Sequence, residues 1–315
     1  MLIAVNTYPF GECGSKPRYL LQKSGHQIRF SPWANRLKPE EVLPSSLNAS
    51  GIIAGTEPYT REILEQCKNL KVLARVGVGF DSVDLAACRE LGITATYTPD
   101  APSLGVAELT IGLMLDLLRG ITRSHIDVSN GLWNRGIGTL VGENVIGVLG
   151  VGRIGKHVVS LLSQFHPAAI LGCDISPNYS FGGEYGIEWV GRQELFHRAN
   201  LVTIHVPLNP ATIGLVDISE LSHMNCGYLI NTARGPIVNE HDLIYALDYG
   251  LLAGYAADVF CQEPYTGPLV GRKRVILTAH IAASARRTRF LMELGATEDC
   301  LAVLNGEQPR NPIPM

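Results

Sequence analysis

A run of apolar residues, Val145 to Leu149, leads directly into a Gly-x-Gly-x-x-Gly pattern at Gly150, Gly152 and Gly155. The first glycine allows a tight turn, the second lets the main chain approach a pyrophosphate, and the third lets the next helix pack against the strand. We expect this helix to run from about Gly152 to Phe165, with its free N–H groups facing the phosphates. The pattern predicts a strand, turn and helix that bind a dinucleotide.

A second apolar run, Ala168 to Cys173, ends in Asp174, about 20 residues after Gly155. A carboxylate at this strand end accepts hydrogen bonds from the ribose hydroxyls of adenosine and repels a 2′-phosphate. No Arg or Lys occurs in residues 175–178 to bind such a phosphate. The glycine pattern also occurs in ordinary turns and in methyltransferases, so it is Asp174 that favours NAD as the cofactor, and NAD over NADP.

Three short stretches near the end of the chain each contain a polar residue of a different kind, namely Arg234, Glu263 and His280. A cation anchors an anionic substrate, an imidazole moves a proton, and a carboxylate favours the protonated imidazole. Taken singly, each residue is more often structural. They are too far apart in sequence to share one helix face, so they can meet only where the carboxyl ends of parallel strands converge.

With these motifs the chain resembles the D-isomer-specific 2-hydroxyacid dehydrogenases, the family of D-3-phosphoglycerate dehydrogenase, glyoxylate/hydroxypyruvate reductase and D-lactate dehydrogenase. The family's catalytic Arg, Glu and His fall on Arg234, Glu263 and His280, and all three identities are retained. The resemblance covers nearly the whole chain, and its most specific segments are Asn231–Gly235, Ala257–Phe260, Gln262–Pro264 and Thr278–His280.

The resemblance also implies which other residues contact the substrate and the cofactor. Main-chain N–H groups of Val76, Gly77, Val78 and Gly79 would bind the substrate carboxylate. Asp258 would contact the nicotinamide carboxamide, although a carboxylate at a strand end also serves as a cap. The implied cofactor contacts are Gly150, Gly152, Arg153, Ile154, Gly155, Asp174, Val206, Pro207, Thr232, Ala233 and Asp258.

The implied activity is hydride transfer between NADH and a small 2-keto acid, by an NAD-dependent enzyme that acts on CH–OH donors. During reduction, His280 would donate a proton to the carbonyl oxygen. Glu263 would hydrogen-bond the other ring nitrogen and favour the imidazolium. The guanidinium of Arg234 would hold the substrate carboxylate with two hydrogen bonds. His205 lies in an apolar strand pattern. We expect it to lie either in the core or at the floor of the cofactor site.

Short apolar or β-branched runs alternate with helical patterns along the chain. They predict an α/β protein with two doubly wound parallel-sheet domains and a cleft between them. A flavodoxin-like substrate domain, discontinuous in sequence, is expected at residues 1–98 and 286–315, and a Rossmann NAD-binding domain at residues 99–285. One long helix, from 103 to about 129, would cross into the second domain, and another, from about 288 to 305, would return to the first.

The predicted helix at residues 103–129 bears apolar residues on several sides, which suggests burial against a second copy of the chain. The family forms its two-fold contact in the corresponding region, so we expect a homodimer. Arg135 follows this helix and either contacts the substrate of a partner subunit or is a solvated surface residue. The apolar residues in question are Ile111, Leu113, Met114, Leu115, Leu117 and Leu118.

Composition excludes several classes of function. The net charge of −3, without a long basic run, gives no electrostatic footprint for nucleic acid or an anionic membrane. The seven cysteines include no Cys-x-x-Cys pair, which is typical of a reduced, cytoplasmic protein. No signal peptide or membrane span is expected. The histidines lack metal-ligand spacing, so no metal is expected either.

The identity of the substrate stays open at this point. Phosphoglycerate dehydrogenases generally present arginines in the loop after the third strand, but here residues 54–60 contain no basic residue and include Glu57. From the length of the chain, we also do not expect the regulatory extension that some of those enzymes carry. Glyoxylate, hydroxypyruvate and pyruvate are therefore at least as plausible as 3-phosphohydroxypyruvate. The alternatives are a phosphite dehydrogenase-like enzyme and an NAD-sensing interaction protein similar to the C-terminal-binding corepressors.

Overall fold

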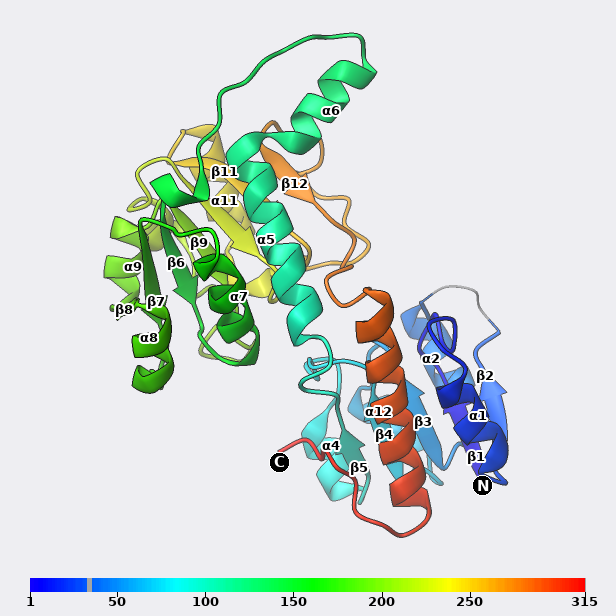
Figure 1. Ribbon diagram of the computed structural model, residues 1–315. Helices are drawn as coiled ribbons and strands as arrows, with labels where there is room; N and C mark the ends of the chain where they lie inside the picture. Colours follow the sequence, from blue (N-terminus) through cyan, green and yellow to red (C-terminus); the bar gives the residue numbers. More distant parts are fainter. Residues whose placement is uncertain (33–35, 315) are drawn as a thin grey trace. The chain divides into compact units, whose positions relative to one another are not determined.

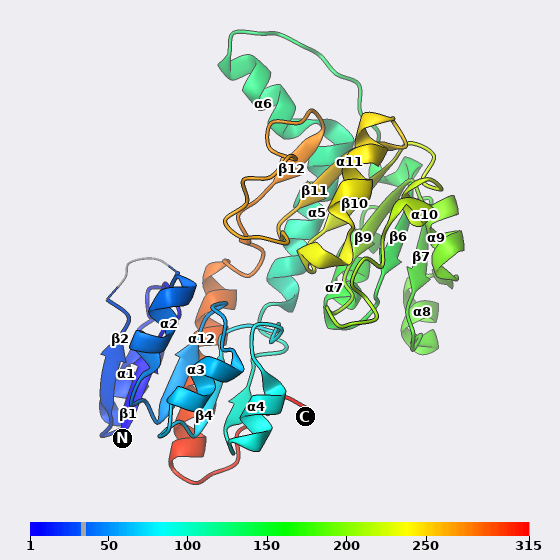
Figure 2. The same cartoon turned by 180° about the vertical axis from the view of Figure 1, so that it is seen from behind.

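The computed structural model describes residues 1–32 and 36–314. The chain forms two compact units, one of Met1–Pro102 with Ala283–Met315 and the other of Ser103–Ala282. Each unit is a parallel β-sheet with helices on both faces (Figures 1 and 2). The predicted fold class, two doubly wound α/β domains, is thereby confirmed. None of the helices in the described part of the chain has the length and apolar character needed to cross a bilayer.

In the first unit, residues 1–32, 36–102 and 283–314 contain a five-stranded sheet in the order β2-β1-β3-β4-β5. The strands are short runs rich in apolar and β-branched residues, and the central ones are buried on both faces, as parallel sheets require. The strands are β1 (Leu2–Val5), β2 (Gln27–Phe30), β3 (Gly51–Ala54), β4 (Val72–Arg75) and β5 (Thr94–Thr96).

Helices cover both faces of this sheet. Apolar residues of α1 and α12 pack on one face, and those of α2, α3 and α4 pack on the other. After α12 the chain returns to β5, where Ile313 N–H donates to the Ala95 carbonyl oxygen. The helices are α1 (Lys16–Lys23), α2 (Pro39–Ser46), α3 (Arg61–Gln66), α4 (Leu85–Glu90) and α12 (Arg286–Leu304).

The second unit, residues 103–282, contains a seven-stranded sheet within the described chain, in the order β12-β11-β10-β9-β6-β7-β8. The chain order reverses between β6 and β9, and ligands bind such sheets at the carboxyl ends of the strands beside this point. The strands are β6 (Val145–Leu149), β7 (Ala169–Cys173), β8 (Ile187–Trp189), β9 (Leu201–Ile204), β10 (Gly227–Asn231), β11 (Leu252–Ala257) and β12 (Val275–Leu277).

Two layers of helices enclose this sheet as well. Helices α5, α7 and α8 pack on one face, and α9, α10 and α11 on the other. The helices are α5 (Ser103–Arg119), α6 (Ile121–Ser129), α7 (Arg153–Ser163), α8 (Tyr179–Tyr185), α9 (Arg192–Arg198), α10 (Ile218–Leu221) and α11 (Glu240–Asp248), with single 3₁₀ turns η1 (Val141–Glu143) and η2 (Gly235–Ile237).

The prediction of one helix from 103 to 129 is wrong, because the chain breaks at Gly120 into α5 and α6. Gly120 adopts a left-handed backbone conformation with φ of 64°, which glycine reaches without steric cost. The Asp116 side chain then accepts a hydrogen bond from Thr122 N–H at 2.8 Å and starts the next helix. Beyond this break, α6 and the extended segment that follows stand away from the sheet of their unit (Figures 1 and 2).

The apolar residues of α5 are covered within their own unit. Ile111, Leu113, Met114, Leu117 and Leu118 are all buried against α7 and the sheet. The apolar character of α5 is therefore explained by its own domain, and the argument that it must face a second copy does not hold. A further set of apolar residues, on α6 and in residues 131–140, is exposed instead.

Candidate functional site

The glycine turn follows β6 at the point where the strand order reverses. Gly150 has φ of +92°, and a Cβ there would lie 2.8 Å from the carbonyl carbon of His205, so a larger residue does not fit. A Cβ on Gly155 would lie 2.1 Å from the Gly150 carbonyl oxygen. A Cβ on Gly152 would meet no described atom within 4 Å. The turn therefore has open space at the glycine where a pyrophosphate would approach the start of α7.

Asp174 lies directly after β7, beside this turn. Its Oδ2 accepts a hydrogen bond from Val151 N–H at 2.7 Å, and its Oδ1 accepts one from Ser176 N–H at 2.8 Å. These bonds hold the carboxylate at the strand end and leave lone pairs for the ribose hydroxyls of an adenosine. The Asp174 carboxylate, as an acceptor, and the open glycine turn fit a bound NAD.

His205 and Val206 follow β9 and pack against the glycine turn. Burial lowers the pKa of His205 to about 3, so its imidazole is neutral at physiological pH. Its Nε2 lies 2.9 Å from the Thr203 hydroxyl, while Nδ1 is buried without a partner in the described chain. His205 is therefore a partly buried, neutral residue beside the glycine turn, where a histidine of the core or beneath the cofactor is expected.

A loop after β10 carries Thr232, Ala233 and Arg234. Asn231, the last residue of β10, shapes this loop because its Oδ1 accepts from Ala233 N–H at 3.0 Å and its Nδ2 donates to the Arg234 carbonyl oxygen at 2.9 Å. The guanidinium of Arg234 donates to the Ala233 carbonyl oxygen at 2.7 Å. The hydroxyl of Thr232 lies 3.0 Å from that of Thr110 on α5. Sequence reasoning gave no role to Asn231, although an Asn before a tight loop is a familiar turn signal.

The structure brings His280 and Glu263 into direct contact in the second unit. His280 Nδ1 lies 2.9 Å from Oε2 of Glu263 and 3.2 Å from Oε1. Oε1 of Glu263 also accepts from Phe260 N–H at 3.2 Å. The His280 side chain is 33% exposed, and its Nε2 contacts no other described residue within hydrogen-bond distance. The pair therefore leaves one ring nitrogen without a partner among the described residues, while a carboxylate holds the other.

The main chain at His280 is unusual. Its φ of 53° lies in the left-handed region, which costs a non-glycine residue roughly 1–3 kcal/mol and persists only where surrounding contacts impose it. The contacts that hold this conformation come from Asp258. This residue directly follows β11 and is completely buried. Its carboxylate accepts hydrogen bonds from the Thr278 hydroxyl at 2.6 Å and from Ile281 N–H and Ala282 N–H, both at 2.8 Å.

In the first unit, the loop Val76 to Gly79 follows β4, but only part of it has free donors. Val76 N–H donates to the Ala54 carbonyl oxygen at 2.9 Å, and Gly77 N–H donates to the Thr98 hydroxyl at 2.8 Å. The N–H groups of Val78 and Gly79 have no hydrogen-bond partner among the described residues. Of the four residues expected to bind a carboxylate through N–H groups, Val78 and Gly79 are those that can do so.

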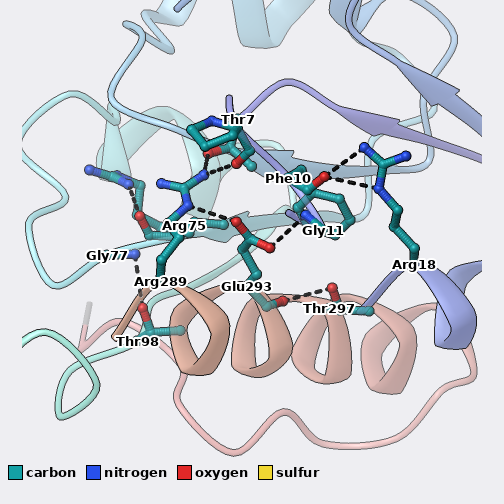
Figure 3. Close-up of polar contacts among 12 residues, drawn as sticks. Thr7, Phe10, Gly11, Arg18, Arg75, Gly77, Thr98, Arg289, Glu293 and Thr297 are labelled. Carbon is teal, nitrogen blue, oxygen red and sulfur yellow. Dashed lines mark hydrogen bonds and ion pairs between the residues drawn. The ribbon is translucent and has the colours of Figure 1, made fainter. Parts of the chain in front are cut away.

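A polar cluster at the carboxyl ends of β1 and β4 was not predicted (Figure 3). Arg289, in the first turns of α12, donates to Glu293 Oε1 and to the Thr7 hydroxyl, both at 2.7 Å. Glu293 is fully buried, and its Oε2 accepts from Gly11 N–H at 2.7 Å. The only sequence signal was the i, i+4 spacing of an Arg and a Glu, which also occurs on many solvated helices.

The buried Arg75 ends β4 near this cluster, and Glu57 is buried in the loop after β3. Glu57 accepts hydrogen bonds from Gly55 N–H at 2.7 Å and from the Tyr59 hydroxyl at 3.0 Å. Burial and the neighbouring Glu57 raise the pKa of Tyr59 well above its usual value, so Tyr59 remains a proton donor to Glu57. Glu57 is therefore a structural acceptor rather than an exposed charge.

The described residues contain no group of three or more His, Cys, Asp or Glu side chains arranged to hold a metal ion. The cysteines of this part of the chain are free thiols. Protonated thiols are favoured by burial, which raises the pKa of Cys88 to about 11 and that of Cys300 to about 12.

Comparisons with known proteins place this arrangement in a family. Residues 111–282 match the family model described as the NAD binding domain of D-isomer specific 2-hydroxyacid dehydrogenases. NAD is accordingly the cofactor of the domain that carries the glycine turn and Asp174.

Curated relatives and solved structures agree with this match. D-3-phosphoglycerate dehydrogenase from Sus scrofa is 35% identical over 86% of the chain and 51% of its own length. Glyoxylate reductase from Thermofilum pendens is 35% identical over 81% of the chain and 78% of its own length. A crystal structure of a protein from Thermus thermophilus has a TM-score of 0.89 and 31% identity, with both chains fully covered.

The chain spans about half the length of the first of these curated relatives, and more than three quarters of the second. The matched family model, the glycine turn and the two parallel-sheet units all indicate the same family. The chain belongs to the D-isomer specific 2-hydroxyacid dehydrogenase family.

Proposed function

We propose that the protein is an NAD-dependent D-2-hydroxyacid dehydrogenase that interconverts a small 2-keto acid and its 2-hydroxy acid. The observation that carries the proposal is the contact between His280 Nδ1 and Glu263 in the NAD-binding domain, with Nε2 of His280 left without a protein partner among the described residues. An imidazole held in this way is oriented for proton transfer through one ring nitrogen.

The chemistry assigns a separate task to each polar residue. Bound NADH supplies the hydride in reduction. His280 donates the Nε2 proton to the substrate carbonyl oxygen as negative charge develops there, and takes a proton back in oxidation. Glu263 accepts the Nδ1–H bond, fixes the ring orientation and stabilises the imidazolium. Arg234 anchors the substrate carboxylate through its guanidinium, which has five N–H donors and also donates from Nη1 to the Ala233 carbonyl oxygen.

The charged side chains of the first unit favour a substrate with an uncharged tail. Of the charged side chains at the carboxyl ends of its central strands, Arg75 and Arg289 are accompanied by the buried carboxylates Glu57 and Glu293. Arg289 is directly paired with Glu293. These two cations are matched by two carboxylates, and Arg36 is a third cation that donates to the Thr56 carbonyl oxygen at 2.9 Å. The loop of residues 54–60 itself contributes no basic residue, whereas a phosphate group carries nearly two negative charges and needs several cations. We therefore rank glyoxylate, hydroxypyruvate and pyruvate above 3-phosphohydroxypyruvate.

Steady-state turnover with NADH and a panel of these four 2-keto acids tests both parts of the proposal. We expect reduction of at least one uncharged-tail acid with a kcat/KM at least about tenfold above that of 3-phosphohydroxypyruvate, a difference of about 1.4 kcal/mol. Preference for the phosphorylated acid would overturn the assignment of the tail. Turnover of none of the four, with NADH bound normally, would contradict the enzymatic function and favour an NAD-sensing role.

We also propose that two copies of the chain associate through the segment formed by α6 and residues 131–140, here called the arm. Trp133 is 80% exposed and Ile137 is fully exposed, and such a concentration of apolar side chains in one projecting segment is typical of an interface. The arm includes Arg135, so association through the arm would bring Arg135 to the second copy. The exposed apolar residues of the arm are Ile121, Ile126, Val128, Leu132, Trp133, Ile137 and Leu140.

A further inference from the structure

We propose that Gly235 is a positioning residue for Glu263, because it lets the main chain that binds this carboxylate settle against the loop of Arg234. The inference rests on the proposed function, in which Glu263 orients His280 for proton transfer. In that case a residue without a side chain keeps the carboxylate within reach of the imidazole.

Gly235 touches the peptide bond between Phe260 and Cys261. A Cβ at residue 235 would lie 2.1 Å from the Phe260 carbonyl carbon and 2.3 Å from the Cys261 nitrogen. Nonbonded carbon atoms pack at about 3.5–4.0 Å, so an alanine could enter only if one of the two segments moved by about 1 Å or more. The contact is therefore main chain against main chain, and only glycine fits it as it stands.

The backbone conformation of residue 235 does not itself require glycine. Gly235 begins the 3₁₀ turn η2, whose dihedral angles other residues adopt as well. Its φ is not positive, unlike that of Gly150 in the glycine turn. The close approach to the neighbouring peptide bond is thus the reason that the structure gives for a glycine at this position.

The peptide that Gly235 touches also holds the carboxylate of the proposed proton-transfer pair. Phe260 N–H donates to Oε1 of Glu263, whose Oε2 lies 2.9 Å from Nδ1 of His280. The rings of Phe260 and Tyr265 stack at a centroid distance of 4.4 Å and an interplanar angle of 21°. These rings flank Glu263 in the sequence, so a displaced Phe260 peptide takes the carboxylate with it.

The loop on the other side of the contact is the more firmly held. Asn231 is completely buried, and its side chain binds both Ala233 N–H and the Arg234 carbonyl oxygen. Cys261, in contrast, is exposed. A methyl group at residue 235 is therefore expected to displace the Phe260 side and to move Glu263 away from His280. A misplacement of about 1 Å in such a group costs up to about 10²-fold in rate.

Gly235→Ala tests the proposal through kinetics. We expect kcat for 2-keto acid reduction at saturating NADH to fall at least about tenfold. The high-pH limit of reduction should also move to lower pH, because the imidazolium loses part of the stabilisation that Glu263 provides. A loss of folding stability alone would not move this limit.

A second measurement does not depend on turnover. Diethyl pyrocarbonate modifies neutral, accessible imidazoles, and mass spectrometry reads each histidine separately. In Gly235→Ala, His280 should react at least about threefold faster at pH 7, while the exposed His241 reacts at an unchanged rate. This result would support the positioning role even if no 2-keto acid tested were a substrate, so the two proposals can fail separately.

Gly227→Ala is the matched control. Gly227 begins β10, at the opposite end of the strand from Asn231, and a Cβ there would lie 2.7 Å from the Asn200 carbonyl oxygen. This variant should lower the melting temperature without changing the reactivity of His280. Tyr265→Leu removes one of the stacked rings but leaves Gly235 in place, and should raise the reactivity of His280 by a smaller factor than Gly235→Ala does.

Two results in Gly235→Ala would overturn the proposal. A melting temperature lowered as in Gly227→Ala, with unchanged His280 reactivity and an unchanged pH profile, would make Gly235 merely structural. A raised KM with unchanged His280 reactivity would show that the loop of Arg234 moves instead. If Gly235→Ala fails to fold, an unchanged reactivity of His280 in Tyr265→Leu would overturn it as well.

Discussion

Two constraints act on the single residue His280. Glu263 holds Nδ1, and the left-handed main chain sets the direction in which the ring leaves the backbone. Neither constraint is a property of histidine itself, whose ring is free to rotate in a solvated loop. The orientation of the ring is therefore set by its neighbours, and the proposed acid/base role can be tested by removing one neighbour at a time.

Replacement of the proposed acid and of its partner should have different consequences. His280→Ala should lower 2-keto acid reduction by roughly 10²- to 10⁴-fold, because proton donation to the developing alkoxide is lost. Glu263→Gln should instead shift the high-pH limit of reduction to lower pH, because the imidazolium loses the carboxylate that stabilises it. Rate profiles from about pH 5 to about pH 10 measure both effects.

NADH binding provides the control for these two variants, since neither change touches the glycine turn. The Kd for NADH should stay within about threefold of the wild-type value. An unaltered pH profile in Glu263→Gln would show that the contact between Glu263 and His280 has no part in proton transfer.

The partly buried His205 makes the stability of the protein depend on pH. Its pKa of about 3 in the folded state lies below the ordinary value of 6.5. Between these values the unfolded chain binds a proton that the folded chain does not, so stability falls with decreasing pH, by up to about 1.4 kcal/mol per pH unit. This contribution is fully present above about pH 6.5.

His205→Gln removes the titrating group and keeps a polar side chain near Thr203. We measure the free energy of unfolding in urea from about pH 7 to about pH 4.5. It should fall less steeply with decreasing pH in the variant, and the two slopes should differ by up to about 1.4 kcal/mol per pH unit. Equal slopes in the two proteins would mean that His205 is protonated in the folded state.

At the scale of single elements, the glycine turn and α7 act as one unit. Gly150 and Gly155 are required by packing, whereas Gly152 borders open space. The same three-glycine pattern thus contains two residues where the turn has no room for a Cβ and one, Gly152, that borders the open space where we propose that a ligand binds. Sequence alone predicted this division of roles, because each spacing matches one geometric demand of a strand–turn–helix unit.

Alanine substitutions separate these roles. Gly152→Ala should change the free energy of unfolding by less than about 1 kcal/mol, because its φ of −77° suits any residue and its Cβ meets no described atom within 4 Å. Its Kd for NADH should nevertheless rise at least about tenfold, because the added methyl group occupies the approach of the pyrophosphate.

Gly155→Ala is the counterpart, since its Cβ would lie 2.1 Å from the Gly150 carbonyl oxygen and force the helix away from the turn. It should destabilise the protein by roughly 1–3 kcal/mol. Urea unfolding and NADH titration of both variants make the comparison. Tight NADH binding by Gly152→Ala would show that the pyrophosphate does not approach this glycine.

At the scale of the whole molecule, the apolar side chains of the arm are not covered by any part of the described chain. The break at Gly120 separates the buried α5 from α6, so the apolar residues that a dimer would cover lie after residue 120. Size-exclusion chromatography with light scattering should give twice the mass of one chain. The double variant Trp133→Asp and Ile137→Asp should elute as a monomer, because two buried charges without partners oppose association.

Tyr249→Asp is a suitable control for the arm variant, since Tyr249 is 70% exposed and directly follows α11. It should leave the mass unchanged. A monomeric wild-type protein would remove the dimer proposal altogether. If the dimer forms and Arg135→Ala impairs only 3-phosphohydroxypyruvate, the arm supplies a cation to the partner's substrate site, whereas equal effects on all four acids would exclude that role.

Several features of this protein follow from the sequence by itself. The strand–turn–helix at residues 145–163, the acidic end of β7 and the alternation that makes two parallel sheets are local or periodic, so they are readable without coordinates. The closeness of Glu263 and His280 also follows, because carboxyl ends of neighbouring parallel strands meet at one edge.

Only the tertiary structure decided which hydrogen-bonding groups are already used. It paired Arg289 with Glu293, took the N–H groups of Val76 and Gly77, and directed three donors onto Asp258. It also buried the apolar sides of α5 within one domain. Each outcome depends on contacts between segments far apart in sequence, where the direction of every N–H and side chain is set by packing that no local pattern encodes.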